Sequence, residues 1–330
     1  MRAFLIDDNH GTLERGVREV DLAAPDADTV RVRVHYSGVN YKDALVAAAT
    51  SRVRRAPRLI GGVDAAGVVA ASHDPHFPVG QRVAVHGGDL GVGRDGGFAE
   101  FVDAPPRWLS ALPDTISTRD AMIIGTAGIA AMASVLVLED HGLGEGEVLV
   151  TGATGGVGSL AVTLLAARGH LPVASTGSPD AREWLLERGA HSVIGRDEIA
   201  DRPDRVLASE RWVGAIDCVG GATLHQVLRS LRYGAAVAAS GLVAGTDLTT
   251  TIYPFITRSV ALLGVDVVEA RPATRARVWA ALGDAVASID VNALVDHEVT
   301  LEELNDALEV VARGASRGRI VVDPSAREPH

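Results

Sequence analysis

The feature that most constrains the fold is a glycine-rich stretch directly after a short apolar run. Residues 147–151 suit a buried parallel strand, and residues 159–168 have the composition of a helix. A strand, a glycine turn and a helix start form a phosphate cradle, because glycine allows close approach and the first N–H groups of the helix face the anion. The glycines follow G-x-x-G-G-x-G, so the interpretation depends on the flanking strand and helix. An ordinary glycine-rich turn is the alternative. The glycines are Gly152, Gly155, Gly156 and Gly158.

Two patterns of secondary structure divide the chain. Residues 1–120 hold short strands and turns with few helices, which is typical of a β-barrel-like domain. In residues 121–266 strands alternate with helices, which predicts a doubly wound parallel sheet. We expect residues 267–330 to return to the first domain. The sequence therefore predicts an α/β protein with one domain at 1–120, completed by 267–330, and a second at 121–266.

Composition argues against several kinds of partner. A net charge of −11 and an aromatic content of 4% disfavour nucleic acid. Cys218 is the only cysteine, which permits no intrachain disulfide and no multi-cysteine zinc site, and fits a cytoplasmic, reducing compartment. No signal-peptide pattern opens the sequence. The longest apolar stretch, residues 122–138, is short for a membrane span, so we expect a buried helix and no membrane partner.

One lysine stands out from the basic residues. Lysine and arginine together number 31, and Lys42 is the only lysine. A lone lysine in this background marks a place where a compact ammonium is needed, although chance in an arginine-rich sequence is the alternative.

Several segments carry a resemblance to a known superfamily. They are residues 37–45 (SGVNYKDAL), 121–128 (AMIIGTAG), 150–158 (VTGATGGVG), 214–220 (GAIDCVG), 253–256 (YPFI) and 264–266 (GVD). Over essentially its whole length the chain resembles the medium-chain dehydrogenase/reductase superfamily, in the quinone-oxidoreductase-like branch that contains NADPH-dependent acrylyl-CoA reductases. This resemblance implies a GroES-like β-barrel catalytic domain and a Rossmann nucleotide-binding domain. It also implies a homodimer, since residues 259–265 resemble the edge strand through which the superfamily pairs.

The resemblance also indicates the chemistry. Alcohol dehydrogenases of the superfamily carry a zinc-ligand cysteine where residues 39–41 stand, Gly-His-Glu where residues 61–63 stand, and a four-cysteine lobe. This chain has none of these ligands, so we expect no metal and a substrate polarised by hydrogen bonds. The candidate catalytic residues are Tyr41, as hydrogen-bond donor or proton source, with Lys42 or Asp43 holding the local network. The alternatives are that Tyr41 packs over the cofactor and that Asp43 caps the following helix.

The choice of cofactor follows from the end of the second nucleotide-domain strand. NAD sites place a carboxylate there, whereas this chain has hydroxyl groups and no carboxylate until Asp180. We therefore predict NADPH, with Arg182 or Arg196 supplying charge for the 2′-phosphate. A surface ion pair is the alternative for Arg196. With the resemblance, the expected cofactor-binding residues are Asn40, Tyr41, Thr126, Thr154, Gly155, Gly156, Val157, Ser175, Thr176, Gly177, Ser178, Arg182, Arg196, Gly241, Leu242, Asp266 and Arg319.

The predicted reaction is reduction of acryloyl-CoA, or another short 2-enoyl-CoA, to propanoyl-CoA by hydride transfer to the β-carbon. An NADPH:quinone oxidoreductase and a non-enzymatic nucleotide-binding protein are the alternatives. Coenzyme A phosphates need a basic patch in an acidic protein, and residues 51–58 contain four arginines. We expect Arg54 and Arg55 to contact these phosphates through bidentate hydrogen bonds. A solvated loop whose charges pair with surface carboxylates is the alternative.

Overall fold

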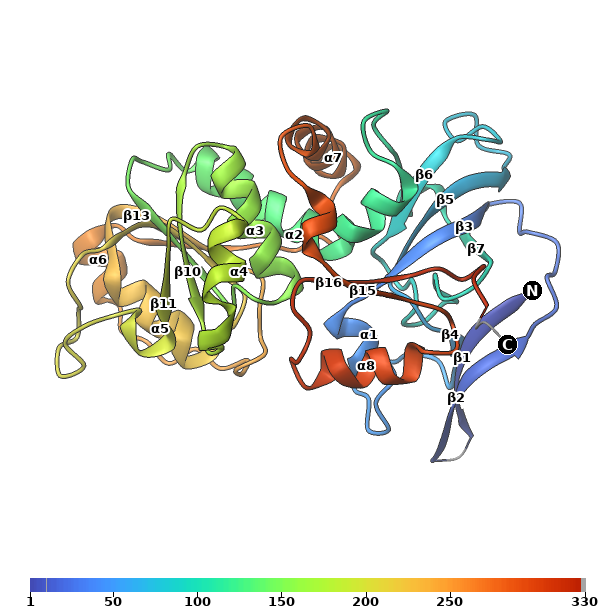
Figure 1. Cartoon of the computed structure of the whole chain (residues 1–330), viewed down its shortest axis with the longest axis horizontal. Coiled ribbons are helices and arrows are strands. Elements are labelled where there is room, and N and C mark those ends of the chain that lie inside the picture. Colours follow the sequence, from blue (N-terminus) through green and yellow to red (C-terminus); the bar gives the residue numbers. More distant parts are fainter. Residues whose placement is uncertain (10, 328–330) are drawn as a thin grey trace. The chain divides into compact units, whose positions relative to one another are not determined.

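The computed structural model describes residues 1–9 and 11–327, which form two compact units (Figure 1). Unit 1 contains Met1–Thr126, Val267–Val286 and the chain from Asp290 on, and unit 2 contains Ala127–Asp266 with Ala287–Ile289. Unit 1 is therefore built from both ends of the chain and unit 2 from its middle. Contacts group residues 121–126 with unit 1, whereas the sequence analysis assigned them to the second domain.

Unit 1 consists mainly of β structure. A three-stranded sheet has the order β2-β1-β4, and a seven-stranded sheet has the order β15-β16-β3-β5-β6-β8, with β7 also paired to β3. The β15–β16 pair is parallel, and the other pairs in these sheets are antiparallel. The strands are β1 (Arg2–Asn9), β2 (Thr12–Glu19), β3 (Val30–Val39), β4 (Arg58–Ile60), β5 (Asp64–Ala71), β6 (Arg82–His86), β7 (Phe101–Ala104), β8 (Leu109–Ala111), β15 (Val295–Val299) and β16 (Arg319–Val322). The helices are α1 (Tyr41–Val46), α7 (Pro272–Val286), α8 (Leu304–Ala312) and the 3-10 turns η1 (Pro106–Trp108) and η4 (Val291–Leu294).

Alternating side chains explain how β3 positions the site. Val30, Val32 and Val34 are buried, as the period-two pattern predicts, because successive residues of a strand point to opposite faces. The end of β3 is buried on both faces and leads directly into α1. A core cluster holds α1 against α8 and β1, through Val46, Leu304 and Phe4 among others. The first turn of α1 is thus fixed by packing on several sides.

Unit 2 is a doubly wound parallel sheet, which confirms the predicted fold class. Its six strands have the order β11-β10-β9-β12-β13-β14, and every neighbouring pair is parallel. Helix α3 packs on β9 and β10, and α5 packs on β12 and β13. The strands are β9 (Glu147–Thr151), β10 (Leu171–Thr176), β11 (Ser192–Gly195), β12 (Trp212–Asp217), β13 (Leu231–Ala239) and β14 (Ala261–Gly264). The helices are α3 (Gly156–Ala167), α4 (Arg182–Glu187), α5 (Gly221–Ser230), α6 (Tyr253–Arg258) and the 3-10 turns η2 (Pro179–Ala181) and η3 (Arg196–Glu198).

Helix α2 (Thr118–Asp140) consists of two helical segments that meet at a kink. The kink is at Gly125, whose backbone has φ 51° and ψ −166°. Only glycine adopts this conformation readily, because it has no Cβ. By length and composition α2 could cross a membrane, but 89% of its most apolar window is buried inside the protein. This burial is what the interpretation as a core helix predicts.

Candidate functional site

The glycine loop of unit 2 forms an open helix start after β9. Gly152 has φ +60°, and its carbonyl accepts a hydrogen bond from the N–H of Gly155 at 3.0 Å. A Cβ on Gly158 would lie 2.2 Å from the carbonyl oxygen of Gly152, so only glycine fits where helix and turn meet. The N-cap residue Gly155 supplies no side-chain cap. The first-turn amides of α3, among half-buried residues that include Thr154, Gly156 and Val157, therefore suit a phosphate group.

The end of β10 lies under an arginine side chain. A Cβ on Gly177 would lie 2.5 Å from Cζ of Arg196, so the guanidinium covers this glycine directly. Next to it, the N–H of Ser178 donates to Oγ1 of the buried Thr176 at 3.0 Å, while Ser175 is also buried. Arg196 is exposed, and it makes no hydrogen bond or ion pair to any residue in the described part of the chain. The surface ion pair considered for Arg196 is thus not formed there.

Arg182 is placed differently. Its Nη1 donates to the carbonyl oxygen of Val193 in β11 at 2.8 Å, which ties the side chain to the sheet edge. Of the two arginines considered for the 2′-phosphate, Arg196 is the one whose guanidinium remains available beside the hydroxyl groups of β10.

The ends of β12 and β13 form the next part of the same sheet edge. Asp217 accepts hydrogen bonds from Oγ1 of Thr151 and from the N–H of Gly220, both at 2.7 Å, and burial raises the pKa of its carboxyl. A Cβ on Gly241, just after β13, would lie 1.9 Å from the carbonyl carbon of Cys218, so only glycine fits where the two chain segments pass each other. Ser240 Oγ is buried and has no partner within residues 1–9 and 11–327. In doubly wound sheets, ligands bind at the carboxyl ends of the strands, where these groups lie.

Two further predicted residues of unit 2 are exposed. Leu242, after β13, is 50% exposed, and Asp266, after β14, is also on the surface. Their positions follow the strand ends, and their roles toward a cofactor stay predictions.

The start of α1 in unit 1 carries the candidate catalytic residues. Tyr41 is 38% exposed and Lys42 is half-buried, so both have access to solvent. Asp43 is 2% exposed, and its carboxylate accepts from the N–H of Asn40 at 2.8 Å and from the N–H of Val63 at 2.9 Å. The carboxyl group of Asp43 thus caps the start of α1, as the alternative proposed, and links it to Val63; a further role of Asp43 in catalysis stays a prediction. Burial, and then the charge of Asp64, raise the pKa of Asp43 to about 7.

Asp64 is a site residue that the sequence analysis missed. Its carboxylate is buried and accepts from the side-chain amide of Asn40 at 3.0 Å and from the N–H of Thr126 at 2.8 Å. The only local signal was a single carboxylate inside an apolar run, residues 59–71.

Arg319 lies close to this carboxylate but is not open to a ligand. It is 3% exposed, and its guanidinium donates to the carbonyl oxygens of Ile123 at 3.0 Å and Val39 at 3.4 Å. Burial lowers the pKa of Arg319, while Asp64 and Asp43 raise it. Arg319 therefore joins three segments of unit 1 from inside, and its role toward a cofactor stays a prediction.

The two arginines expected to bind coenzyme A are both engaged within unit 1. The side chain of Arg54 is 6% exposed, pairs with Asp8 at 2.6 Å and donates to the carbonyl of Val46 at 2.7 Å. Arg55 is exposed and pairs with Asp89 at 2.6 Å. The paired-loop alternative describes both side chains, and Arg54 in particular cannot reach a phosphate without breaking buried hydrogen bonds. The prediction for Arg54 is therefore corrected.

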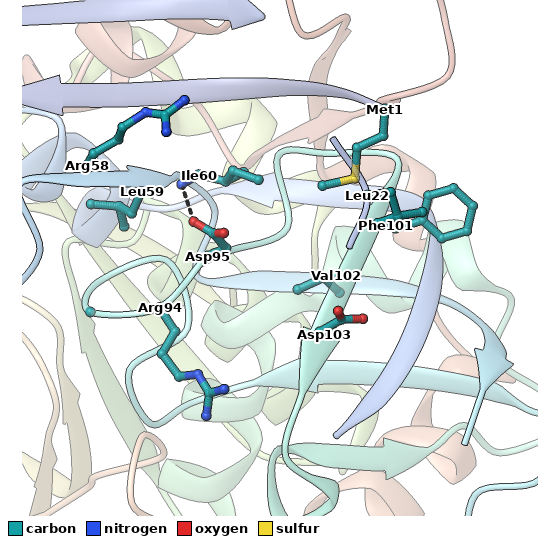
Figure 2. Close-up of a pocket in the computed structure, with 11 residues that line it drawn as sticks. Met1, Leu22, Arg58, Leu59, Ile60, Arg94, Asp95, Phe101, Val102 and Asp103 are labelled. Atoms are coloured by element: carbon teal, nitrogen blue, oxygen red, sulfur yellow. Dashed lines mark hydrogen bonds between the residues drawn. The ribbon is translucent and has the colours of Figure 1, made fainter. Parts of the chain in front are cut away.

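Figure 2 shows a hollow of about 330 Å³ in unit 1 that contains none of the predicted site residues. Its wall is held by a hydrogen bond from the N–H of Ile60 to Asp95 at 2.8 Å. The side chains of Arg58 and Arg94 extend in different directions, so their charges do not converge on one ligand group. We do not place the substrate there.

Within residues 1–9 and 11–327, no group of three or more His, Cys, Asp or Glu side chains is arranged to hold a metal ion.

Comparison with known proteins places this geometry in a family. The family described as "Alcohol dehydrogenase GroES-like domain" matches residues 26–114, and that described as "Zinc-binding dehydrogenase" matches residues 156–284. Acrylyl-CoA reductase AcuI of Ruegeria pomeroyi is 40% identical over 97% of each chain. The chain belongs to the medium-chain dehydrogenase/reductase superfamily. YhfP of Bacillus subtilis, a superfamily member named as a quinone oxidoreductase, is 44% identical over 89% of this chain and 90% of its own length.

Solved structures of the superfamily agree with the fold. The yhdH oxidoreductase from Salmonella enterica, in complex with NADP, has a TM-score of 0.93 and 40% identity, covering 98% of this chain and 99% of its own. Bacillus subtilis yhfP with NAD bound has a TM-score of 0.94 and 41% identity, covering 98% of each chain. The relatives named as reductases and the matching dehydrogenase families confirm the predicted enzyme class, an oxidoreductase.

Proposed function

We propose that this chain reduces the carbon–carbon double bond of acryloyl-CoA, or of a similarly short 2-enoyl-CoA, with NADPH as reductant. The observation that carries this is the 40% identity to acrylyl-CoA reductase AcuI over 97% of both chains. The open start of α3 and the unpaired guanidinium of Arg196 support the dinucleotide part of the proposal.

The residues of unit 2 fit an NADPH molecule at the sheet edge. The first turn of α3 would hold the pyrophosphate, because its amides lack a cap. Arg196, with the hydroxyl groups of Thr176 and Ser178, would hold the 2′-phosphate, since Arg196 lies over Gly177 and no carboxylate occupies that place. When bound, NADPH supplies a hydride.

The residues of unit 1 would handle the charge and the proton of the substrate. Hydride addition at the β-carbon leaves negative charge on the thioester oxygen, and a donor placed in advance stabilises it. The Tyr41 hydroxyl is our candidate for this donor or for the proton that reaches the α-carbon, because it is exposed at the start of α1. The Lys42 ammonium would hold the hydrogen-bond network around Tyr41 and supply positive charge beside it. The Asp43 carboxyl accepts a hydrogen bond from the main-chain N–H of Asn40. We assign Asn40 to contact with the nicotinamide end of the cofactor.

Four further assignments belong to this proposal. We take the domain at 1–120 with 267–330 as catalytic and that at 121–266 as the NADP-binding domain. The reaction is zinc-independent, because the ligand residues of the zinc enzymes are replaced at 39–41 and 61–63. The enzyme is cytoplasmic, given the single cysteine.

The fourth assignment is a homodimer formed through β14. This strand is at the edge of its sheet, and Leu262 on it is 38% exposed. Ile256 and Tyr253 on the adjacent α6 are 67% and 51% exposed. An apolar edge strand favours pairing with a second copy.

Quinone reduction is the second candidate, favoured by the 44% identity to YhfP. The two are separated by measuring NADPH oxidation with acryloyl-CoA and with a soluble quinone in parallel. We expect the larger kcat/KM for acryloyl-CoA. A larger kcat/KM for the quinone would reverse the assignment.

A further inference from the structure

We propose that Asp64 is a positioning residue that fixes Asn40 and Thr126 relative to each other, so that the nicotinamide end of the cofactor is correctly oriented. The catalytic part of this inference rests on the proposed function. The structural part, a shared buried anchor for two segments, does not.

The geometry around Asp64 brings three donors from two segments of unit 1 onto one carboxylate. Its Oδ1 accepts from the N–H of Gly38 at the end of β3, at 3.2 Å. Its Oδ2 accepts from the side-chain amide of Asn40 at 3.0 Å and from the N–H of Thr126 in α2 at 2.8 Å. Asp64 is 0% exposed, so no water molecule from bulk solvent replaces these donors. Displacing the carboxylate would release both segments together.

The kink in α2 frees a main-chain N–H group that donates to the Asp64 carboxylate. In an uninterrupted helix the N–H of Thr126 would donate to the carbonyl four residues earlier. The left-handed backbone of Gly125 turns that N–H away, and Asp64 accepts it instead. A Cβ on Gly125 would lie 2.8 Å from Oδ2 of Asp64 and 2.6 Å from Nη2 of Arg319. Glycine is therefore required for both charged side chains to reach this point.

Two buried polar atoms beside Asp64 have no partner within the described ranges. They are Oγ1 of Thr126 and Nη2 of Arg319. Buried polar atoms normally form hydrogen bonds, since leaving them unsatisfied is costly. A buried carboxylate and guanidinium also cost free energy to desolvate, and burying them is weakly stabilising at best. Stability alone therefore does not explain why these charged groups are buried with two polar atoms left unsatisfied. Positioning Asn40 and Thr126 toward a ligand does explain it.

The test compares Asp64→Asn with Ser37→Ala. The asparagine retains the shape but presents an NH2 group to N–H donors, so at least one of the three hydrogen bonds is lost. The control removes the 2.6 Å hydrogen bond from Ser37 Oγ to the main-chain oxygen of Asp64, and leaves the carboxylate in place. Both variants lose a buried hydrogen bond to the same residue, but only the first alters the group that holds Asn40 and Thr126, because it removes the negative charge that their N–H groups face.

Three quantities are measured on both variants: the melting temperature without cofactor, the Kd for NADPH by protein fluorescence, and kcat with KM for acryloyl-CoA. For Asp64→Asn we expect kcat to fall at least tenfold and the Kd for NADPH to rise at least fivefold. The NADPH/NADH preference should stay unchanged, because the 2′-phosphate site is in unit 2. For Ser37→Ala we expect a lower melting temperature with Kd and kcat within twofold of wild type. Equal Kd and kcat in the two variants would overturn the proposal.

A second variant keeps the test decisive if Asp64→Asn does not fold. Asp64→Glu retains the charge and both acceptor oxygens but moves them by one methylene. We expect a folded protein with reduced kcat, and a wild-type kcat would refute the positioning role. NADPH binding needs no substrate, so it tests Asp64 even if acryloyl-CoA is not reduced. If only a quinone is reduced, the proposed function fails, and the same comparison is made with the quinone.

Discussion

Two buried ionisable side chains of unit 1 should give the stability of this protein opposing pH dependences. Asp43 has a pKa raised to about 7, chiefly by burial and then by the charge of Asp64. His86, at the end of β6, is 1% exposed and has a pKa lowered to about 3 by burial and then by Arg275. Neither ring nitrogen of His86 finds a partner in the part of the chain that is described. We therefore consider replacing each residue with a neutral amide, as Asp43→Asn and His86→Gln.

The sign of each effect follows from which state binds more protons. Between about pH 4 and 7, Asp43 is protonated in the folded state and ionised in the unfolded state, so the free energy of unfolding falls as pH rises. Between about pH 3 and 6.5, His86 is neutral in the folded state and protonated in the unfolded state, so the free energy of unfolding rises with pH. Each slope is about 1.4 kcal/mol per pH unit, and they nearly cancel between pH 4.5 and 6.5.

The variants separate the two slopes. From pH 4.5 to 6.5 we expect Asp43→Asn to gain on the order of 2 kcal/mol of unfolding free energy relative to the wild type, because only the His86 slope remains. His86→Gln should lose a similar amount over the same interval. The assay is urea unfolding followed by circular dichroism at fixed pH values, with differences taken against the wild type so that the other titrating groups cancel. Parallel curves for the wild type and Asp43→Asn would show that this carboxyl titrates normally.

Four further predictions concern the site. Arg196→Ala should raise KM for NADPH about 10- to 100-fold, the value of one or two charged hydrogen bonds, and leave NADH unaffected, with Arg182→Ala as a neutral control; equal effects on both cofactors would remove Arg196 from the 2′-phosphate. Tyr41→Phe should lower kcat at least about tenfold with nearly unchanged Kd for NADPH, and wild-type turnover would reduce Tyr41 to a packing role. Arg54→Ala should destabilise by about 3 kcal/mol in urea unfolding without changing KM for acryloyl-CoA, since it breaks a buried pair; a raised KM would restore its coenzyme role. Leu262→Asp should convert a dimer to a monomer in light scattering, and a wild-type monomer would refute the assembly.

Local patterns were enough to predict the elements that bear the site. The alternation in β3 and the strand–glycine–helix order at β9 are short-range signals, and both were correct. The helix start was misplaced, because Gly156 was assigned to the turn whereas α3 already begins there. Glycine has a poor helix propensity, so packing of the helix on the sheet overrides the local preference.

Long-range partners could not be predicted. Asp64 is separated by 24 residues from Asn40 and by 62 from Thr126, and nothing local identifies these donors. The same holds for Arg54, whose pairing with Asp8 removes it from the surface that its sequence neighbours suggested. A run of arginines indicates charge but not whether each charge is already neutralised, because that depends on which carboxylates the fold brings close.

The origin of unit 1 from both chain ends has a consequence for biosynthesis. Strand β3 obtains its β16 neighbour only when residues 319–322 have been made, and Ile320 pairs with Val39 immediately before the segment that carries the candidate catalytic residues. The middle of the chain, which forms unit 2, leaves the ribosome earlier and can fold while β3 still has an unpaired edge. Until Arg319 arrives, Asp64 also has no guanidinium to offset its charge. The nascent chain is therefore open to edge-to-edge aggregation at β3 until residues 319–322 have been made, and the surroundings of Asp64 are completed only then.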